Sequence, residues 1–466
     1  MVNLRARTIR GAAALAALLA TPALAERVTV PPGSAAQPAL DRAAAGDVVV
    51  LARGIHRGPV QVGANVTLEG EPGAVVEGPG QGSVVTISGP GGIVRGLTIR
   101  GSGRDLGTMD AGIFVKKGAA GAVVEGNRLE GNLYGIYLHG AENSLARGNV
   151  IIGIEEGRLN EAGNGISVWS ASGARVEDND ISFGRDGIFS VASKRNVFRG
   201  NRFSKLRFAV HYMYTDDSEI ADNVSTGNTV GFAIMFSHRL RVRNNVSDGD
   251  LNHGFLFNFA NNSEITGNTV KGRMLPAIRW VTRGFRGSKG DAREHGLPAA
   301  EEASSTETSG FRNAPEKCVF IYNANKNKFR NNWFEGCDIG VHFTAGSEGN
   351  EITGNAFVQN RNQVKYVGTR YLDWSKDGRG NFWSDNPAFD LNGDGIADTA
   401  YRPNDIIDKV LWTAPQAKVL VNSPAMQIIR WAQAQFPALL PGGVVDSRPL
   451  MAPAVVPSSD GSARSQ

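Results

Sequence analysis

Soft metal ligands gather in one short stretch of the sequence. His211, Met213, Met235 and His238 fall close together, although the whole chain contains only 7 His and 7 Met. Thioether sulfur and imidazole nitrogen are donors that suit Cu(I), an ion that binds with a low coordination number. The four residues therefore predict a copper site. Because methionine also fills irregular gaps, the alternative is a methionine patch that docks a partner protein.

A second group of donors consists of oxygen atoms spaced as in a calcium loop. Oxygen-bearing residues occupy positions 1, 3, 5 and 9, with a glycine at position 6 and a main-chain carbonyl available at position 7. The predicted ligands are the side chains of Asp390, Asn392, Asp394 and Asp398 and the carbonyl of Ile396. Tyr401 stands at position 12, where a bidentate Glu is expected. The sequence thus predicts an isolated structural calcium loop, and an ion-free loop of Asx turns is the alternative.

The chain has two cysteines, Cys318 and Cys337, which are separated by 19 residues. Stacked turns of a repeating fold would bring them within reach of a disulfide. Two reduced cysteines packed in the interior are the alternative.

A helix with one apolar face is predicted near the C-terminus. Ser423 and Pro424 have the residue types of an N-cap and a first helical position. Members of the helix that could dock on a membrane partner are Ile428, Ile429, Trp431 and Phe436. The alternative is a helix that closes the open end of a repeating fold. From the residues alone the capping role is favoured.

An enzymatic role is a further alternative, since carboxylates on an outer face of an all-β repeat protein can act on acidic polysaccharides. Asp216 with Asp217, and Asp248 with Asp250, are the candidates. The sequence shows no Asp-Pro-His-Asp run and no regular cluster of carboxylates and arginines on successive repeats. The four acids are therefore interpreted as turn residues.

The element that positions these groups is a repeat of about 22 residues. Its clearest marker is an Asn of the turns that recurs at Asn127, Asn149, Asn179, Asn201, Asn223, Asn245 and Asn268. Short alternating strands precede each Asn, and alternation puts neighbouring residues on opposite faces. Ten residues before successive members stand His139, Trp169, Val191, Met213, Met235 and Asn258, which should point away from the core.

Short strands at a fixed period, with turns rich in Gly and Asn, are typical of a solenoid. Glycine supplies 58 of the 466 residues, which fits the demand for turns. The predicted fold is all-β, a right-handed parallel β-helix over residues 26–385 with a long loop at 283–316. The calcium-like loop (386–405), a capping or docking segment (406–451) and a loose tail (452–466) follow it.

Residues 1–25 have the form of a secretory signal peptide, in which Arg5, Arg7 and Arg10 precede a short apolar stretch and an A-x-A site. Its removal lowers the formal charge from +4 to +1, which argues against a nucleic-acid partner. No apolar run reaches the ~18 residues of a membrane-spanning helix. The expected location is the periplasm.

Two C-terminal segments resemble the NosD family. One extends from Tyr371 through Gly378 to Asp405 and includes the calcium-like loop, and the other extends from Arg430 to Ser447. The resemblance covers essentially the whole mature chain. It implies a non-enzymatic periplasmic accessory protein for maturation of the copper–sulfur site of nitrous oxide reductase.

The resemblance also implies partners and cofactors. The partners would be an ABC transporter, made of an ATPase and a membrane permease, and nitrous oxide reductase, with a copper chaperone as a further candidate. Copper would be held transiently as Cu(I), and the C-terminal helix would dock on the permease. A secreted polysaccharide lyase or C5-epimerase and an inert scaffold solenoid are the alternatives.

Overall fold

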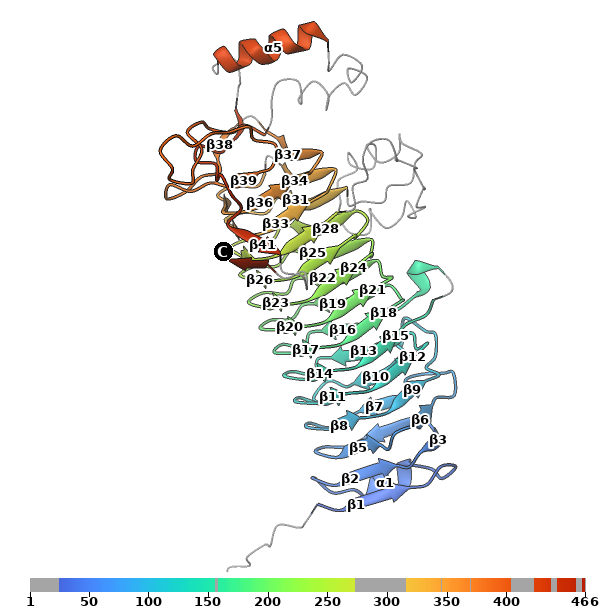
Figure 1. The fold of residues 1–466 in the computed structure, drawn as a ribbon. Coiled ribbons are helices and arrows are strands. Elements are labelled where there is room, and N and C mark those ends of the chain that lie inside the picture. The colour runs from blue at the N-terminus through green and yellow to red at the C-terminus, as the bar shows by residue number, and fades with distance from the viewer. Residues whose placement is uncertain are drawn as a thin grey trace, which may run out of the picture.

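The computed structural model describes residues 25–155, 158–272, 316–344, 346–368, 370–403, 423–436, 442–457 and 463–465. Three long sheets of parallel strands run side by side along the molecule, with 13, 12 and 13 strands (Figure 1). Each turn of the chain contributes one strand to each sheet. The right-handed parallel β-helix predicted from the repeat is confirmed.

The first sheet contains β1 (Arg27–Val30), β2 (Val48–Leu51), β5 (Thr67–Gly70), β8 (Ile93–Arg95), β11 (Val123–Glu125), β14 (Leu145–Arg147), β17 (Arg175–Glu177), β20 (Val197–Arg199), β23 (Glu219–Ala221), β26 (Arg241–Arg243), β29 (Glu264–Thr266), β32 (Lys328–Arg330) and β35 (Glu351–Thr353).

The second, 12-stranded sheet contains β4 (Val60–Val62), β7 (Val85–Ile87), β10 (Ala111–Val115), β13 (Tyr134–His139), β16 (Ile166–Trp169), β19 (Asp186–Val191), β22 (Phe208–Met213), β25 (Val230–Met235), β28 (His253–Asn258), β31 (Lys317–Tyr322), β34 (Ile339–Thr344) and β37 (Asn362–Val367).

The third sheet contains β3 (Gly54–Arg57), β6 (Ala74–Glu77), β9 (Thr98–Arg100), β12 (Arg128–Glu130), β15 (Val150–Ile152), β18 (Asp180–Ser182), β21 (Arg202–Ser204), β24 (Val224–Thr226), β27 (Val246–Asp248), β30 (Thr269–Lys271), β33 (Trp333–Glu335), β36 (Ala356–Val358) and β39 (Phe382–Trp383).

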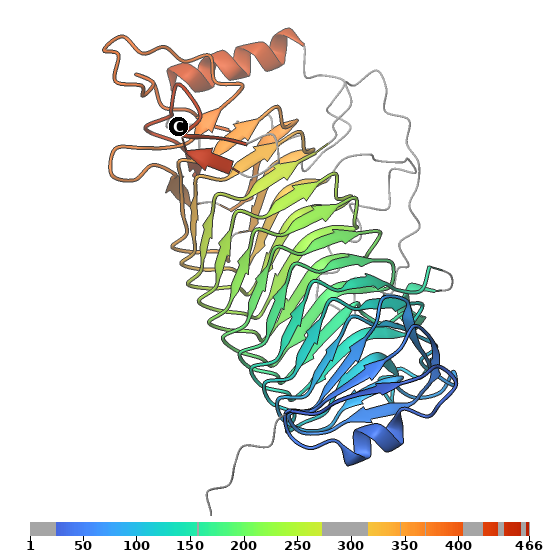
Figure 2. The ribbon, with the colours of Figure 1, turned by 60° about the horizontal axis from the view of Figure 1, so that its bottom comes forward.

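The remaining elements lie near the ends of the chain or in one corner. Helix α1 (Gln37–Arg42) buries Leu40 at the N-terminal end of the solenoid (Figure 2). A 3₁₀ turn, η1 (Leu159–Glu161), interrupts one corner. Near the C-terminus, β38 (Tyr371–Asp373) pairs in parallel with β40 (Gly443–Val445), and β41 (Val455–Pro457) pairs in antiparallel fashion with β42 (Ala463–Ser465). Helix α5 spans Pro424–Gln435. Over the described part of the chain, no helix combines the length and the apolar character that a membrane span requires.

A column of asparagines joins the turns of the solenoid, as the repeat predicts. Each ladder Asn donates its Nδ2 to the Oδ1 of the Asn on the next turn, as in Asn201 to Asn223 at 2.9 Å. The backbone N–H of the donating Asn bonds to the same oxygen, at 3.0 Å from Asn201 to Asn223. The column continues past the predicted members through Asn332, Asn355 and Asn381. The Asn ladder is therefore structural, because each amide is fully used between turns.

Asp446 ends this ladder. Its Oδ2 accepts the backbone N–H of Asn381 at 2.7 Å and the indole N–H of Trp383 at 2.8 Å. The C-terminal segment thus supplies an acceptor to the last amide donor of the column. Since a buried donor without an acceptor costs free energy, this contact ties the C-terminal segment to the end of the solenoid.

The strands of the 12-stranded sheet alternate between two apolar environments. In β25, Phe232 and Ile234 point into the main core of the solenoid. Ala233 and Met235 belong instead to a second apolar cluster on the other face of the same sheet. We call this the outer cluster. Its buried members are Phe208, Val230, Ala233, Met235, Leu256 and Phe320, with Met213, Phe236 and Tyr322 packed against it.

Candidate functional site

The two predicted sulfur ligands lie on neighbouring turns of the outer cluster. Met213 of β22 and Met235 of β25 are direct partners in the parallel register. Adjacent strands of a sheet lie ~4.8 Å apart, so two side chains at partner positions can reach one ion. Met235 is fully buried and Met213 is half-buried. The methionines are therefore neighbours, as the 22-residue spacing predicts, but they do not form an open patch on the surface.

His211 lies on the same face of β22 and is held by a buried ion pair. Its Nδ1 is 3.1 Å from Oδ2 of Asp186, which opens β19 on the preceding turn. Asp186 also receives two hydrogen bonds from Arg207, from Nε to Oδ1 at 2.8 Å and from Nη2 to Oδ2 at 2.7 Å. The three side chains are at most 5 % exposed. A bidentate pair of this kind fixes the carboxylate, and the carboxylate fixes the imidazole ring.

The electrostatics of this group keep the imidazole neutral. Burial raises the pKa of Asp186, but Arg207 and His211 together outweigh that effect and hold the pKa below its usual value. Burial lowers the pKa of His211 more than the nearby Asp186 raises it. His211 is therefore neutral at pH 7, which is the protonation state that a metal ligand requires.

Aromatic rings enclose the same histidine. The rings of Phe189 and Phe208 lie with their centroids 4.9 Å from that of His211. The guanidinium of Arg207 lies over the ring of Phe208, 4.4 Å from its centroid. The imidazole thus sits among aromatic rings beside the Asp186–Arg207 ion pair, a setting in which electrostatic contacts are strengthened.

His238, the fourth predicted ligand, does not lie on the strand of Met235. Strand β25 ends at Met235, and Phe236 follows with a left-handed φ of 48°. The turn at Phe236 carries His238 off the sheet, where it forms an isolated bridge with Asn261. Its Nδ1 lies 3.3 Å from the Nδ2 of Asn261. His211, Met213 and Met235 therefore share the outer face of the sheet, and His238 does not.

The donor chemistry of the remaining three residues fits a soft ion. One neutral imidazole and two thioethers match the preference of Cu(I) for nitrogen and sulfur. Within the described ranges, no three or more His, Cys, Asp and Glu side chains come together as a group that could hold a metal. A site on this face therefore depends on the methionine sulfurs.

The predicted calcium loop folds around hydrogen bonds of its own backbone. Asp390 accepts the N–H groups of Gly393 at 2.7 Å and Gly395 at 2.8 Å. Asp398 accepts the N–H of Leu391 at 2.7 Å. The other predicted members, Asn392, Asp394 and Ile396, are joined by bonds of 2.9–3.1 Å within the loop. These hydrogen bonds hold the loop together, and the calcium site stays a prediction.

Cys318 and Cys337 are joined by a disulfide, with their Cα atoms 5.6 Å apart. Cys318 lies on β31 and Cys337 follows β33, so the bond closes a single turn of the solenoid. Both residues are fully buried.

Helix α5 exposes the apolar residues that were predicted to dock. Ile428, Ile429, Trp431 and Phe436 are 64, 40, 63 and 60 % exposed. A capping helix would bury this face against the solenoid. The exposures therefore favour the docking interpretation over the capping one.

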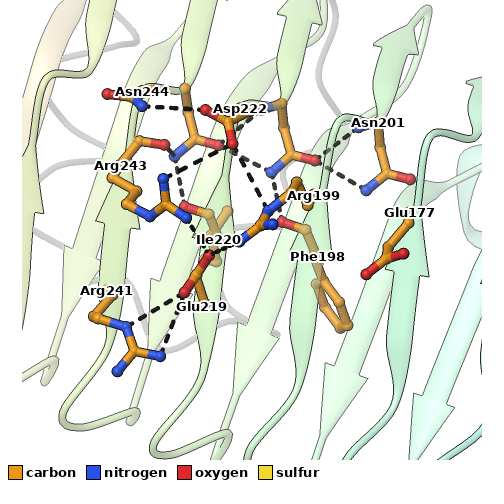
Figure 3. A network of polar contacts seen from close by, with 12 residues as sticks. Glu177, Phe198, Arg199, Asn201, Glu219, Ile220, Asp222, Arg241, Arg243 and Asn244 are labelled. Carbon is orange, nitrogen blue, oxygen red and sulfur yellow. Dashed lines mark hydrogen bonds and ion pairs between the residues drawn. The ribbon is translucent and has the colours of Figure 1, made fainter.

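Carboxylates and arginines form clusters on successive turns, so the prediction that no such cluster is present is wrong. On the first sheet Glu219 lies among Arg199, Arg241 and Arg243, with hydrogen bonds of 2.5–3.4 Å (Figure 3). This cluster faces outward and links three turns electrostatically. The signal is missed in the sequence because the partners are 20 to 24 residues apart and slightly offset in register.

The candidate carboxylates of the enzymatic alternative occupy turns and the interior. Asp216 and Asp217 both bind Arg239, with Asp217 at 2.5 Å from its Nε. Asp217 has a left-handed φ of 53°. Asp250 is fully buried. Asp216, Asp217 and Asp250 lie outside the strands, in agreement with their interpretation as turn residues, whereas Asp248 is the last residue of β27.

The sequence indicated neither Asp186 and Arg207, which hold the ring of His211, nor a role for Asn258. Asp186 is the first residue of β19 and Arg207 immediately precedes β22, so neither lies in the column that contains the methionines. Asn258 was placed in the same column as the methionines, and the register confirms it as the partner of Met235. A polar amide in an otherwise apolar column was the available signal.

Comparisons with known proteins identify relatives of the whole chain. Residues 154–388 match the NosD family, described as periplasmic copper-binding protein. The probable ABC transporter binding protein NosD of Stutzerimonas stutzeri is 40 % identical over 401 residues, which is 86 % of each chain. The protein of the same name from Pseudomonas aeruginosa is 39 % identical, over 86 % of this chain and 87 % of its own.

Among solved structures, the A-module of the mannuronan C-5 epimerase AlgE4 from Azotobacter vinelandii aligns with a TM-score of 0.50 and 14 % identity. The alignment covers 72 % of this chain and 92 % of the epimerase module. At that identity the likeness concerns the fold alone. Sequence identity over most of the chain, together with the family match, carries the assignment: the chain belongs to the NosD family of periplasmic copper-binding proteins.

Proposed function

We propose that this protein receives or relays copper in the periplasm during maturation of nitrous oxide reductase, and that it works with an ABC transporter. Copper is its cargo, bound transiently as Cu(I). The ligands are Nε2 of His211 and the thioether sulfurs of Met213 and Met235. The protein is an accessory protein and catalyses no covalent step of its own.

The observation that carries this proposal is that Asp186, held by Arg207, fixes the ring of His211. Histidines that bind metals commonly use one ring nitrogen for the ion and the other for a carboxylate, which fixes the tautomer and the orientation of the ring. Asp186 supplies that carboxylate at Nδ1, and Arg207 holds Asp186 from two atoms. Two methionines in register on the same face complete a soft donor set.

The burial of this group argues against the polysaccharide alternative. Asp186, Arg207 and His211 have side chains that are 1–5 % exposed. A polymer must reach the groups that act on it, whereas a single ion needs only a narrow approach. The arrangement therefore supports a metal-ion role over an open catalytic groove.

Helix α5 is proposed as the contact with the membrane permease. Its apolar side chains are exposed, and the tryptophan among them is a residue type suited to the boundary between protein, lipid and water. The coupling would be mechanical, because movement of the permease changes which partner the solenoid engages.

Anaerobic Cu(I) titration tests the site. The double variant Met213→Leu with Met235→Leu keeps the apolar volume but removes both sulfurs, and we expect at least a tenfold loss of affinity. Met451→Leu, a half-exposed methionine elsewhere in the chain, is the matched control and should bind like the wild type. Unchanged affinity of the double variant would reject this site.

Deletion of the gene, followed by recovery of nitrous oxide reductase from the periplasm, tests the pathway. We expect reductase that lacks part of its copper. Reductase with its full metal content would reject a maturation role, even for a protein that binds copper in vitro.

A further inference from the structure

We infer that Asn258 is the oxygen-bearing member of the copper site, placed beside Met235 to hold the oxidised ion as well as the reduced one. This inference rests on the proposed function and extends it to a residue and an oxidation state. It rests on a side-chain amide that is buried and has no hydrogen-bond partner among the described residues.

The side chain of Asn258 is fully buried, and neither Oδ1 nor Nδ2 has a hydrogen-bond partner among the described residues. Burying an amide without hydrogen bonds costs about 1–3 kcal/mol by mutational measures. Buried polar groups in native proteins are nearly always paired, so such an amide needs an explanation. A ligand or ion that occupies the site in the working protein supplies one.

Other buried asparagines of this protein show how unusual Asn258 is. Asn268, on the same turn, donates Nδ2 to Asn332 at 3.0 Å and to the carbonyl of Val242 at 2.9 Å. Asn245 is bonded in the same manner. The solenoid thus satisfies the amides that it uses for structure. Asn258 lies outside that ladder and has no such role.

The position of Asn258 connects it to the proposed copper ligands. It is the register partner of Met235, which is itself the register partner of Met213. On its other side the register partner is Tyr322. Met213, Met235 and Tyr322 all belong to the outer cluster or pack against it. The amide is therefore a polar group between a thioether and an aromatic ring in this column.

An amide oxygen changes what a thioether site can bind. Thioethers favour Cu(I), whereas oxygen and imidazole donors suit Cu(II), and weak oxygen ligands are known to tune copper potentials. With Asn258 as the register partner of Met235, an oxygen donor lies on the strand next to a thioether of the proposed site, and the site accommodates both oxidation states. Removing that oxygen should favour Cu(I) selectively.

The test is Asn258→Leu, measured in two ways. Without metal, the variant should unfold at a higher urea concentration than the wild type, since a costly buried amide has been replaced by an apolar side chain. With metal, Cu(II) affinity should fall at least tenfold while Cu(I) affinity stays within about twofold. Each tenfold decrease in the Cu(II) affinity relative to the Cu(I) affinity raises the one-electron reduction potential of the bound copper by about 59 mV.

Two further variants keep the result interpretable. Asn258→Asp restores an oxygen donor and should recover Cu(II) affinity, although it buries a charge. Tyr322→Leu changes the neighbouring member of the column and should leave the Cu(II) to Cu(I) ratio as in the wild type.

The outcomes separate the inference from the proposed function. A wild-type protein that binds neither ion overturns the proposed function and the inference with it. A wild type that binds copper, together with an Asn258→Leu variant whose two affinities are unchanged, overturns the inference alone. Loss of metal-free stability in that variant also overturns it, because it would show that the amide has a structural partner.

Discussion

A carboxyl group in the interior of the solenoid should make the stability of this protein depend on pH. Asp250 is fully buried. It accepts hydrogen bonds from the hydroxyls of Ser225 at 2.7 Å and Ser247 at 2.5 Å and from the N–H of Asn228 at 2.8 Å. Within the described residues no cation forms an ion pair with it. Burial raises the pKa of Asp250 to about 7, in spite of these donors.

The size and sign of the effect follow from that pKa. The ordinary value is 3.8, so the shift is about three units, and each unit corresponds to about 1.4 kcal/mol. Between pH 4 and 7 the unfolded chain has lost this proton while the folded chain retains it. Stability must therefore fall as the pH rises through that window, by about 4 kcal/mol in total, and then level off.

The perturbation is Asp250→Asn, which keeps the shape of the side chain and removes the titration. Urea unfolding at pH 5, 6, 7 and 8 should show the difference in unfolding free energy, variant minus wild type, rising by about 2–3 kcal/mol from the lowest to the highest pH. Asp180→Asn, at an exposed position of β18, is the control and should show no such trend. A pH-independent difference for Asp250→Asn would refute the reasoning, since it would mean that the carboxyl is ionised throughout.

Three further predictions concern the scaffold and its partner surface. Replacing Cys318 and Cys337 together by Ala should cost about 3 kcal/mol of unfolding free energy in urea titrations, because the bond closes a 19-residue separation; equal stability would show that the bond contributes little. Asn223→Ala should cost about 2–5 kcal/mol, since it leaves two buried donors of the neighbouring ladder residue without an acceptor, and a loss below 1 kcal/mol would contradict the role of the ladder. Ile428→Asp in α5 should abolish co-purification with the membrane permease, whereas Leu391→Asp, at another exposed apolar side chain, should not; retention by Ile428→Asp would exclude α5 as the contact.

The residues proposed as copper ligands show which contacts can be predicted from spacing in the sequence. Met213 and Met235 could be placed side by side from the sequence because their separation equals one turn, and a parallel ladder puts residues one period apart in register. His238 failed the same reasoning because the chain turns at Phe236, whose left-handed backbone has no signature in an aromatic residue. Spacing along the chain predicts register only while the strand continues.

The amino-acid sequence by itself determined the solenoid, its period, the Asn ladder and the columns of residues on each sheet, because periodicity in one dimension becomes stacking in three. The tertiary structure alone decided the environment of each column. It paired Asp186 with His211 and Arg207 across turns, and it buried Met235 in the outer cluster and Asn258 on the neighbouring strand. Burial and hydrogen bonding depend on everything that packs around a side chain, so no local pattern of residues can specify them.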